Sequence, residues 1–280
     1  MSRHRLRTAE TYAFVIPFCL AILFPFAVML SSALKKDAEI FVTAEEFRFV
    51  SASPQWGNFL ELPKQLPLFG RYFLNSAAIA TGATLLAVIV ALPAAYALSR
   101  LRFAGRRAFL YAVLVTQMFS PIVIIIGLFK LFAGLPIPLT NSLWGLILAN
   151  AAFNLAFAIW MLSGYFNTVP AEIEEAAMVD GCTWVQMIVR ILIPLAAPGI
   201  VTATIFVFIA SWNEFIFALT LLASPEKRPV IVGLFSLIGM YEVKWNFVMG
   251  GALLAVLPMI VLFWVAEKHI VSGLTAGGVK

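Results

Sequence analysis

Six apolar segments, each about twenty residues long, divide this chain and constrain its fold more than any motif does. A helix rises about 1.5 Å per residue, so segments of this length can cross a bilayer with every backbone group bonded internally. A content of 62% hydrophobic and 12% charged residues is far from that of a soluble domain. The sequence therefore predicts an all-α polytopic membrane protein, with one transmembrane domain over residues 1–280. The spans are expected near residues 12–34, 73–98, 109–129, 142–162, 200–223 and 247–266.

Proline within several of these segments predicts kinked helices, because a membrane helix tolerates proline where neighbouring helices bond the freed carbonyls. These prolines are Pro17, Pro25, Pro93, Pro121 and Pro258. The first segment follows three arginines, as in a secretory signal peptide, but it is longer than a signal's apolar core. We expect an uncleaved membrane anchor.

The distribution of arginine predicts the orientation of the chain. The short connection after the second segment holds four arginines and no acid, whereas the next short connection, residues 132–141, holds no charge. Both termini and residues 163–197 are therefore expected in the cytoplasm, and residues 35–72 and 224–246 outside. The four arginines are Arg100, Arg102, Arg106 and Arg107.

No residue pattern indicates catalysis, a metal site or a bound cofactor. Cys19 lies in the first span and Cys182 in the cytoplasmic loop, so they cannot form a structural disulfide across compartments. No zinc-ligand spacing, phosphate-binding glycine loop or metalloprotease motif occurs. The chain is predicted to be a non-catalytic membrane protein without a cofactor of its own.

The cytoplasmic loop, residues 163–197, is predicted to form two short helices around a bend. Good helix formers fill residues 171–179, Asp180 and Gly181 provide a stop, and Thr183 with Gln186 fits a capping box before a second helix that ends near Pro194. Glu172 and Glu175 share a helical face beside Ala176 and Ala177. Such a face suits either an arginine-lined cleft of another protein or the membrane surface.

The order of residues in this loop resembles the signature of permease subunits of ATP-binding-cassette importers. The signature reads Glu-Ala-Ala, three residues, Gly, nine residues, Ile, two residues, Pro, and departs from the family only at Ile193, where leucine is usual. The resemblance implies a coupling helix seated in a groove of an ATPase subunit, with Glu175 paired to an ATPase arginine, Ala176 and Ala177 in the contact surface, and Gly181 at the bend. It implies coupling roles for Glu175, Ala176, Ala177, Asp180, Gly181, Ile191 and Pro194.

Two further resemblances point to the sugar-importing branch of this permease family. The C-terminal residues 273–280 resemble the tail of maltose-type sugar permeases, which implies contact of Thr275, Ala276, Gly277 and Gly278 with the ATPases; composition alone would suggest a frayed end. In the fifth span, Trp212, Asn213 and Glu214 resemble a run of Trp-Asn followed by an acid or amide that many carbohydrate permeases carry.

Glu214 is the one acidic residue deep in a predicted span, and a charged carboxylate there costs about 2.5–3.5 kcal/mol to insert. It can face a water-filled pathway, hydrogen-bond Asn213 or a partner subunit, or be held protonated by its apolar surroundings. Gln117 and Asn154 are weaker candidates, because polar groups between helices mostly make packing bonds.

The resemblance implies a complex in the bacterial inner membrane. Its expected partners are a second, homologous permease, two ATPase subunits that hold ATP and Mg²⁺, an extracytoplasmic solute-binding protein, membrane lipid and a sugar substrate, but no nucleic acid. The sequence does not identify the sugar. An ion-coupled secondary transporter using Glu214 is the alternative; paired inverted halves and further buried ionisable groups, which that class commonly shows, are missing from the sequence.

Overall fold

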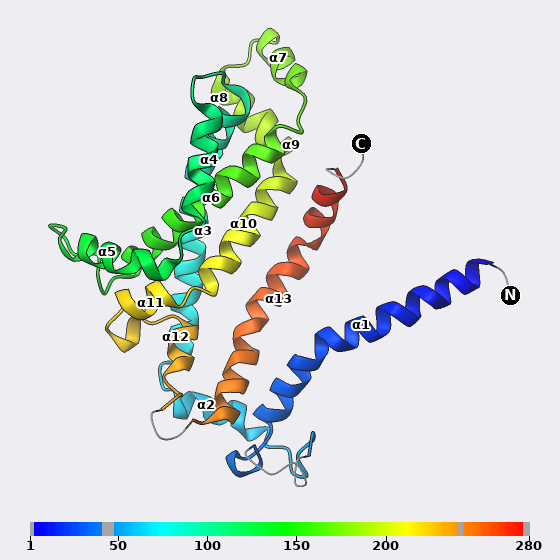
Figure 1. Ribbon diagram of the computed structural model, residues 1–280, viewed down its shortest axis with the longest axis vertical. Helices are drawn as coiled ribbons and strands as arrows, with labels where there is room; N and C mark the ends of the chain where they lie inside the picture. Colours follow the sequence, from blue (N-terminus) through cyan, green and yellow to red (C-terminus); the bar gives the residue numbers. More distant parts are fainter. Residues whose placement is uncertain (1–2, 41–47, 240–242, 277–280) are drawn as a thin grey trace. The chain divides into compact units, whose positions relative to one another are not determined.

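The computed structural model describes residues 3–40, 48–239 and 243–276, and its regular elements there are all helical. The all-α fold predicted from the sequence is confirmed. Contacts divide the chain into two compact units, one of Met1–Gly70 with Gly233–Leu257 and one of Arg71–Val232 with Pro258–Lys280 (Figure 1).

Four helices are long and apolar enough to cross a membrane without a break. They are α1 (Arg3–Ala33), α3 (Phe69–Arg100), α6 (Leu143–Phe166) and α13 (Trp245–Ala276). Two further candidates are bent pairs: α4 (Arg106–Thr116) with α5 (Pro121–Ala133), at 94°, and the stretch Trp184–Leu195 with α10 (Ala197–Trp212), at 76°. By length and composition, the described residues therefore contain four candidate spans, or up to six if each bent pair is one span.

The prediction that the third span is a single helix is wrong. Its predicted range, 109–129, is interrupted between Thr116 and Pro121, and Ser120 has an extended backbone at φ −65° and ψ 137°. Proline pushes the preceding residue out of the helical region and lacks the N–H that would continue a helix, yet it suits the first helical position. Pro121 therefore begins a new helix instead of kinking an existing one.

The fifth predicted span, 200–223, is also divided. α10 ends at Trp212, and a separate six-residue helix, α11 (Ile216–Leu221), follows. The remaining short elements are α2 (Gly57–Gln65), α7 (Ala171–Val179), α8 (Trp184–Met187), α9 (Ile193–Leu195), α12 (Val230–Phe235), the 3₁₀ turns η1 (Asp37–Glu39) and η3 (Pro225–Lys227), and the π turn η2 (Ile188–Leu192).

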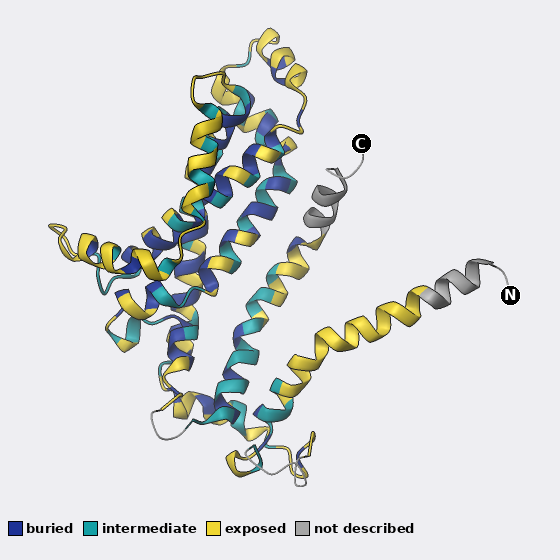
Figure 2. Cartoon of the chain, viewed as in Figure 1, coloured by how far each residue is buried: buried dark blue, intermediate teal, exposed yellow. Residues whose placement is uncertain are grey.

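Small residues allow the helices of the second unit to pack closely. On α3 a stripe of four alanines at four-residue spacing is fully or almost fully buried, namely Ala83, Ala87, Ala91 and Ala95. On α10, Gly199 lies against the ring of Tyr165 of α6, and a Cβ at this glycine would overlap that ring. Figure 2 shows the resulting burial along α3, α6 and α10.

The first unit is held by α2 and the turn that follows α1. Asn58 of α2 donates from Nδ2 to the carbonyl oxygens of Ala33, at 2.8 Å, and Lys35, at 3.1 Å. Further along, Gly251 of α13 leaves room for the side chain of Leu234. Within α1, the most apolar window, in Thr11–Ala33, has no buried residue in the structure.

Candidate functional site

The loop between α6 and α10 forms a helical elbow at one end of the second unit (Figure 1). We use "elbow" for residues 171–195. α7 covers Ala171–Val179, and Gly181 adopts a left-handed φ of +85°, so that its N–H and that of Cys182 bond back to the carbonyls of Met178 and Ala177. The predicted first helix and its glycine stop are confirmed.

The second arm of the elbow begins with the predicted capping box. Thr183 Oγ1 accepts from the backbone N–H of Gln186 at 3.3 Å, and Gln186 Oε1 accepts from that of Thr183 at 2.9 Å. α8 then continues through the π turn η2 into α9. In η2, Ile191 is half-buried and Leu192 is buried, and in α9 Pro194 is exposed. The helix breaks at Ala196, two residues beyond Pro194.

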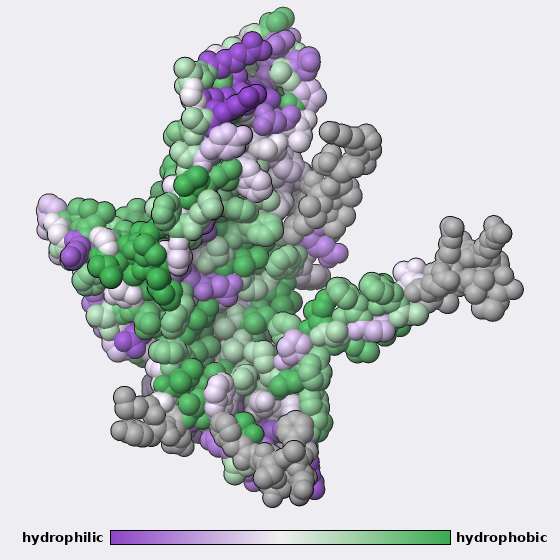
Figure 3. All heavy atoms as spheres, viewed as in Figure 1, coloured by the Kyte–Doolittle hydropathy of each residue, from purple (hydrophilic) through white to green (hydrophobic). Residues whose placement is uncertain are grey.

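The outer face of α7 is acidic and apolar. Glu172 and Glu175 are both exposed, as are Ala176, Met178 and Val179, and Asp180 is exposed at the end of the helix. Figure 3 shows hydrophilic side chains gathered at the end of this unit that carries α7 and α8, and hydrophobic ones over α5. This face is accessible to another protein.

Ala177 does not belong to that exposed face, which corrects the expectation that it forms part of a contact surface. Only 5% of Ala177 is exposed, because it packs into the core formed by α3, α6 and α10. It lies three residues after Glu174, on the inner face of α7. Of the two alanines in the signature, only Ala176 is available for contact.

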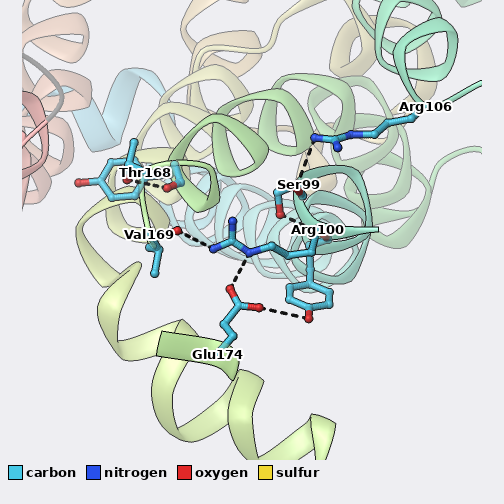
Figure 4. Close-up of polar contacts among 8 residues, drawn as sticks. Ser99, Arg100, Arg106, Thr168, Val169 and Glu174 are labelled. Atoms are coloured by element: carbon cyan, nitrogen blue, oxygen red, sulfur yellow. Dashed lines mark hydrogen bonds and ion pairs between the residues drawn. The ribbon is translucent and has the colours of Figure 1, made fainter. Parts of the chain in front are cut away.

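The inner face of α7 is fixed to α3 by a mostly buried ion pair that no sequence pattern predicted. Arg100 Nε lies 2.6 Å from Glu174 Oε1, and Arg100 Nη2 donates to the carbonyl oxygen of Val169 at 2.7 Å (Figure 4). Tyr96 Oη donates to Glu174 Oε2 at 3.4 Å. The side chains of Arg100 and Glu174 are 14% and 10% exposed, so water screens this pair poorly.

The same end of α3 also contacts the second arm. The ring of Tyr96 lies 6.0 Å from that of Trp184, edge to face at 79°. Thus α3 holds α7 through polar contacts and α8 through an aromatic one. The sequence signal for this inner face was limited to the three-residue spacing of Glu174 and Ala177, which puts them on one side of α7 without naming the partner helix.

Glu214 lies in the break between α10 and α11 and caps the shorter helix. Its carboxylate accepts from the backbone N–H groups of Phe217, at 2.6 Å, and Ala218, at 2.9 Å. Glu214 therefore has a structural hydrogen-bonding role, but with backbone groups of α11 and not with the expected Asn213, whose Nδ2 donates to Ile209. Beside it, Trp212 is buried between the rings of Phe73 and Phe208.

The other polar candidates in the spans also bond within the chain. Asn213 is exposed and its Nδ2 donates to Ile209 at 2.9 Å. Gln117 Nε2 donates to the carbonyl of Phe153 at 2.6 Å, and Asn154 Nδ2 donates to Asn150 at 2.9 Å and Ser211 Oγ at 3.5 Å. A place in the pathway stays a prediction for all five candidates, Trp212, Asn213, Glu214, Gln117 and Asn154.

The C-terminal candidates fall at the limit of the structure. Thr275 and Ala276 end α13, while Gly277 and Gly278 lie outside the described residues.

Comparison with known proteins assigns this arrangement to a family. Residues 83–268, which include the whole elbow, match the binding-protein-dependent transport system inner membrane component family. The chain belongs to this family. It is 36% identical over 267 residues to the inner membrane ABC transporter permease protein YcjP of Escherichia coli K12, covering 94% of this chain and 93% of that protein.

Other relatives agree. The trehalose transport system permease protein SugB of Mycobacterium tuberculosis is 38% identical over 76% of this chain and 78% of its own length. A bacterial ABC transporter involved in the import of alginate contains a chain with the same fold, with a TM-score of 0.75 and 24% identity over 96% of this chain and 99% of that chain. The chain is therefore a non-catalytic permease subunit of a binding-protein-dependent importer, in the inner membrane. Family membership decides against the ion-coupled secondary transporter.

Proposed function

We propose that this permease subunit forms half of the translocation pathway of a carbohydrate importer. The substrate class is supported by the likeness to a trehalose permease and by the maltose-type tail of residues 273–280. A second, homologous permease would complete the pathway within the lipid bilayer. The unburied apolar surface of α1 is suited to contact with that subunit or with lipid.

The elbow is the proposed connection to two ATPase subunits, which would hold the ATP and Mg²⁺. The exposed carboxylate of Glu175 suits bidentate pairing with an ATPase arginine, and Ala176 beside it permits close approach. Asp180 and Gly181 would orient the two arms, and Ile191 and Pro194 would support the second arm from within the chain. The tail residues Thr275, Ala276, Gly277 and Gly278 would reach the same subunits.

At the other end of the second unit, an ordered surface is suited to an extracytoplasmic solute-binding protein. Asn141 Nδ2 donates to Ser224 Oγ at 2.8 Å, and Lys227 Nζ donates to the carbonyl of Asn141 at 2.6 Å. These bonds fix the loop 224–228 against the end of α6. By the positive-inside rule, the arginines at the α3–α4 connection support a cytoplasmic location for both termini and the elbow.

The observation that carries the proposal is the exposure of Glu175 and Ala176 on a helix whose opposite face is held by α3. The test is copurification of the ATPase with E175A, compared with a matched E226A variant in the outer loop. We expect E175A to retain at least tenfold less ATPase and E226A to retain the wild-type amount. Equal retention by both variants would contradict the proposed coupling surface.

The substrate class has its own test. The reconstituted complex is supplied with its solute-binding protein and a panel of disaccharides, oligosaccharides and amino acids. We expect saccharides alone to stimulate ATP hydrolysis. Stimulation by an amino acid and not by any saccharide would reject the carbohydrate proposal while leaving the importer assignment intact.

A further inference from the structure

The contacts at the two ends of α3 point to a specific mechanical role for this helix. We propose that α3 is the membrane helix that moves together with the elbow, and that Arg100 is the positioning residue that joins them. This inference rests on the proposed coupling role of the elbow. It goes beyond that role because it names the helix that carries the motion through the bilayer.

The chain does not connect α3 to the elbow directly. α7 follows α6 and precedes α8, whereas Arg100 is 74 residues before Glu174. Arg100 binds both Glu174 and the carbonyl of Val169, so it holds the first turn of α7 and the turn that joins α7 to α6. A rotation of α7 away from α3 would have to break both contacts at once.

Burial makes this joint resistant to opening. A surface ion pair is screened and contributes little, but separation of a poorly exposed pair leaves charges without partners in a medium of low dielectric constant. Arg100 and Glu174 are mostly removed from solvent, and Ala177 packs beside them into the core. Tyr96, one turn before Arg100, extends the joint to Trp184 on the second arm.

The opposite end of α3 is also fastened by side chains. Asn75 Nδ2 donates to the carbonyls of Glu226, at 2.9 Å, and Arg228, at 3.0 Å, and Ser76 Oγ accepts from the backbone N–H of Val230 at 2.8 Å. Asn75 and Arg100 are 25 residues apart on one helix, which corresponds to about 38 Å. α3 thus links the elbow to the outer loop that we assign to the solute-binding protein.

Closure of the ATPases would therefore displace α3 as a unit with α7, and with it the loop 224–230. The buried alanine stripe along α3 supports movement as a rigid body, because small side chains let the helix pack closely against α6 and α10 in the core that also includes the elbow. In the other direction, docking of a solute-binding protein on the outer loop would reach the elbow through the same helix.

The test measures coupling in the assembled complex. The readout is the ratio of ATP hydrolysis with and without loaded solute-binding protein, in R100Q, E174Q, the reversals R100E and E174R, and the swap R100E/E174R. R107Q, which changes an exposed arginine of the same connection, is the matched control. We expect R100Q to lose at least fivefold of the stimulation, R107Q to lose less than twofold, and the swap to recover at least half of it.

The inference is overturned if R100Q reduces the stimulation of ATP hydrolysis less than fivefold. It is also overturned if the R100E/E174R swap shows no more stimulation than R100E or E174R alone. If R100Q fails to assemble, the S76A variant tests the inference instead, because it alters only the outer end of α3. We expect S76A to retain a normal amount of ATPase and to reduce the stimulation of ATP hydrolysis at least fivefold. Normal stimulation in S76A overturns the inference. Failure of the proposed function is separate and recognisable, since the wild-type chain would then retain no ATPase.

Discussion

Glu174 and Glu175 are adjacent in the sequence, but one is bound within the chain and the other is exposed. Glu174 is buried against Arg100 of α3 at 2.6 Å, whereas Glu175 is exposed on the outer face of α7. Successive residues on a helix are about 100° apart, so α7 turns one carboxylate toward its own chain and leaves the next one exposed, where we propose that it binds an ATPase. The two should therefore respond differently to substitution.

We expect E174A to destabilise the subunit and E175A to leave its stability unchanged. Removal of Glu174 leaves Arg100 with a poorly solvated charge, which costs about 1–3 kcal/mol for a pair that is not fully buried. A change at an exposed site is usually within about 0.5 kcal/mol. Thermal unfolding of the purified, detergent-solubilised subunit, monitored by size-exclusion chromatography, measures both changes in stability. Equal melting temperatures for the two variants would argue against a structural role for Glu174.

Gly181 should not tolerate a side chain. Its φ of +85° costs an L-residue about 1 kcal/mol, and the bend between α7 and α8 depends on it. We expect G181A to lower the melting temperature and to reduce ATPase copurification. The control is G127A within α5, where a Cβ meets open space and alanine favours the helix. A G181A subunit as stable as G127A would show that the bend forms without a left-handed residue.

The contact of Gly199 with Tyr165 predicts a packing defect. G199A should destabilise the α6–α10 contact by about 1–3 kcal/mol, because the added methyl overlaps the ring. The control is G164A, on the helix α6 that carries Tyr165; a Cβ there meets open space, so this variant should not be destabilised. The double variant G199A/Y165L is expected to lose less stability than the sum of its single changes, since removal of the ring relieves the overlap. Strict additivity would count against this close contact.

Glu214 is predicted to act as a helix cap and not as a coupling group. E214A should cost about 1 kcal/mol, the usual value of an N-terminal cap, and E214Q less, because it keeps one acceptor oxygen. Uptake by the E214Q complex is expected to remain dependent on ATP and indifferent to ion gradients. A stable E214Q complex that hydrolyses ATP normally but transports nothing would instead give this carboxylate a role in the pathway.

The elbow could be predicted from the sequence because its determinants are local. The helix formers of residues 171–179, the left-handed Gly181 and the Thr183–Gln186 box each act within four residues, so a single sequence reveals them. The spans likewise follow from segment length and hydropathy. Hydropathy does not, however, distinguish two short apolar helices in succession from one long helix. In the third predicted span the two helices are separated at Ser120, whose backbone is extended before Pro121.

The Arg100–Glu174 joint could not be predicted in the same way. Its partners are 74 residues apart, and nothing local indicates which arginine of the α3–α4 connection turns inward. Ala177 was misplaced for a related reason: alanine suits both a buried face and an exposed one. Only the packing of α7 against α3 decides that Ala177 is covered and Ala176 is not.

The most direct measurement is cross-linking from α7 to an ATPase in the assembled complex. Cysteine is introduced at Ala176, and separately at Ala223 in the exposed outer loop as a control, in a background without Cys19 and Cys182. A bifunctional reagent that joins a thiol to an amine is then added. We predict that the cysteine at Ala176 becomes cross-linked to the ATPase and that the cysteine at Ala223 does not. An assembled, active complex in which Ala176 gives no such product would contradict the account.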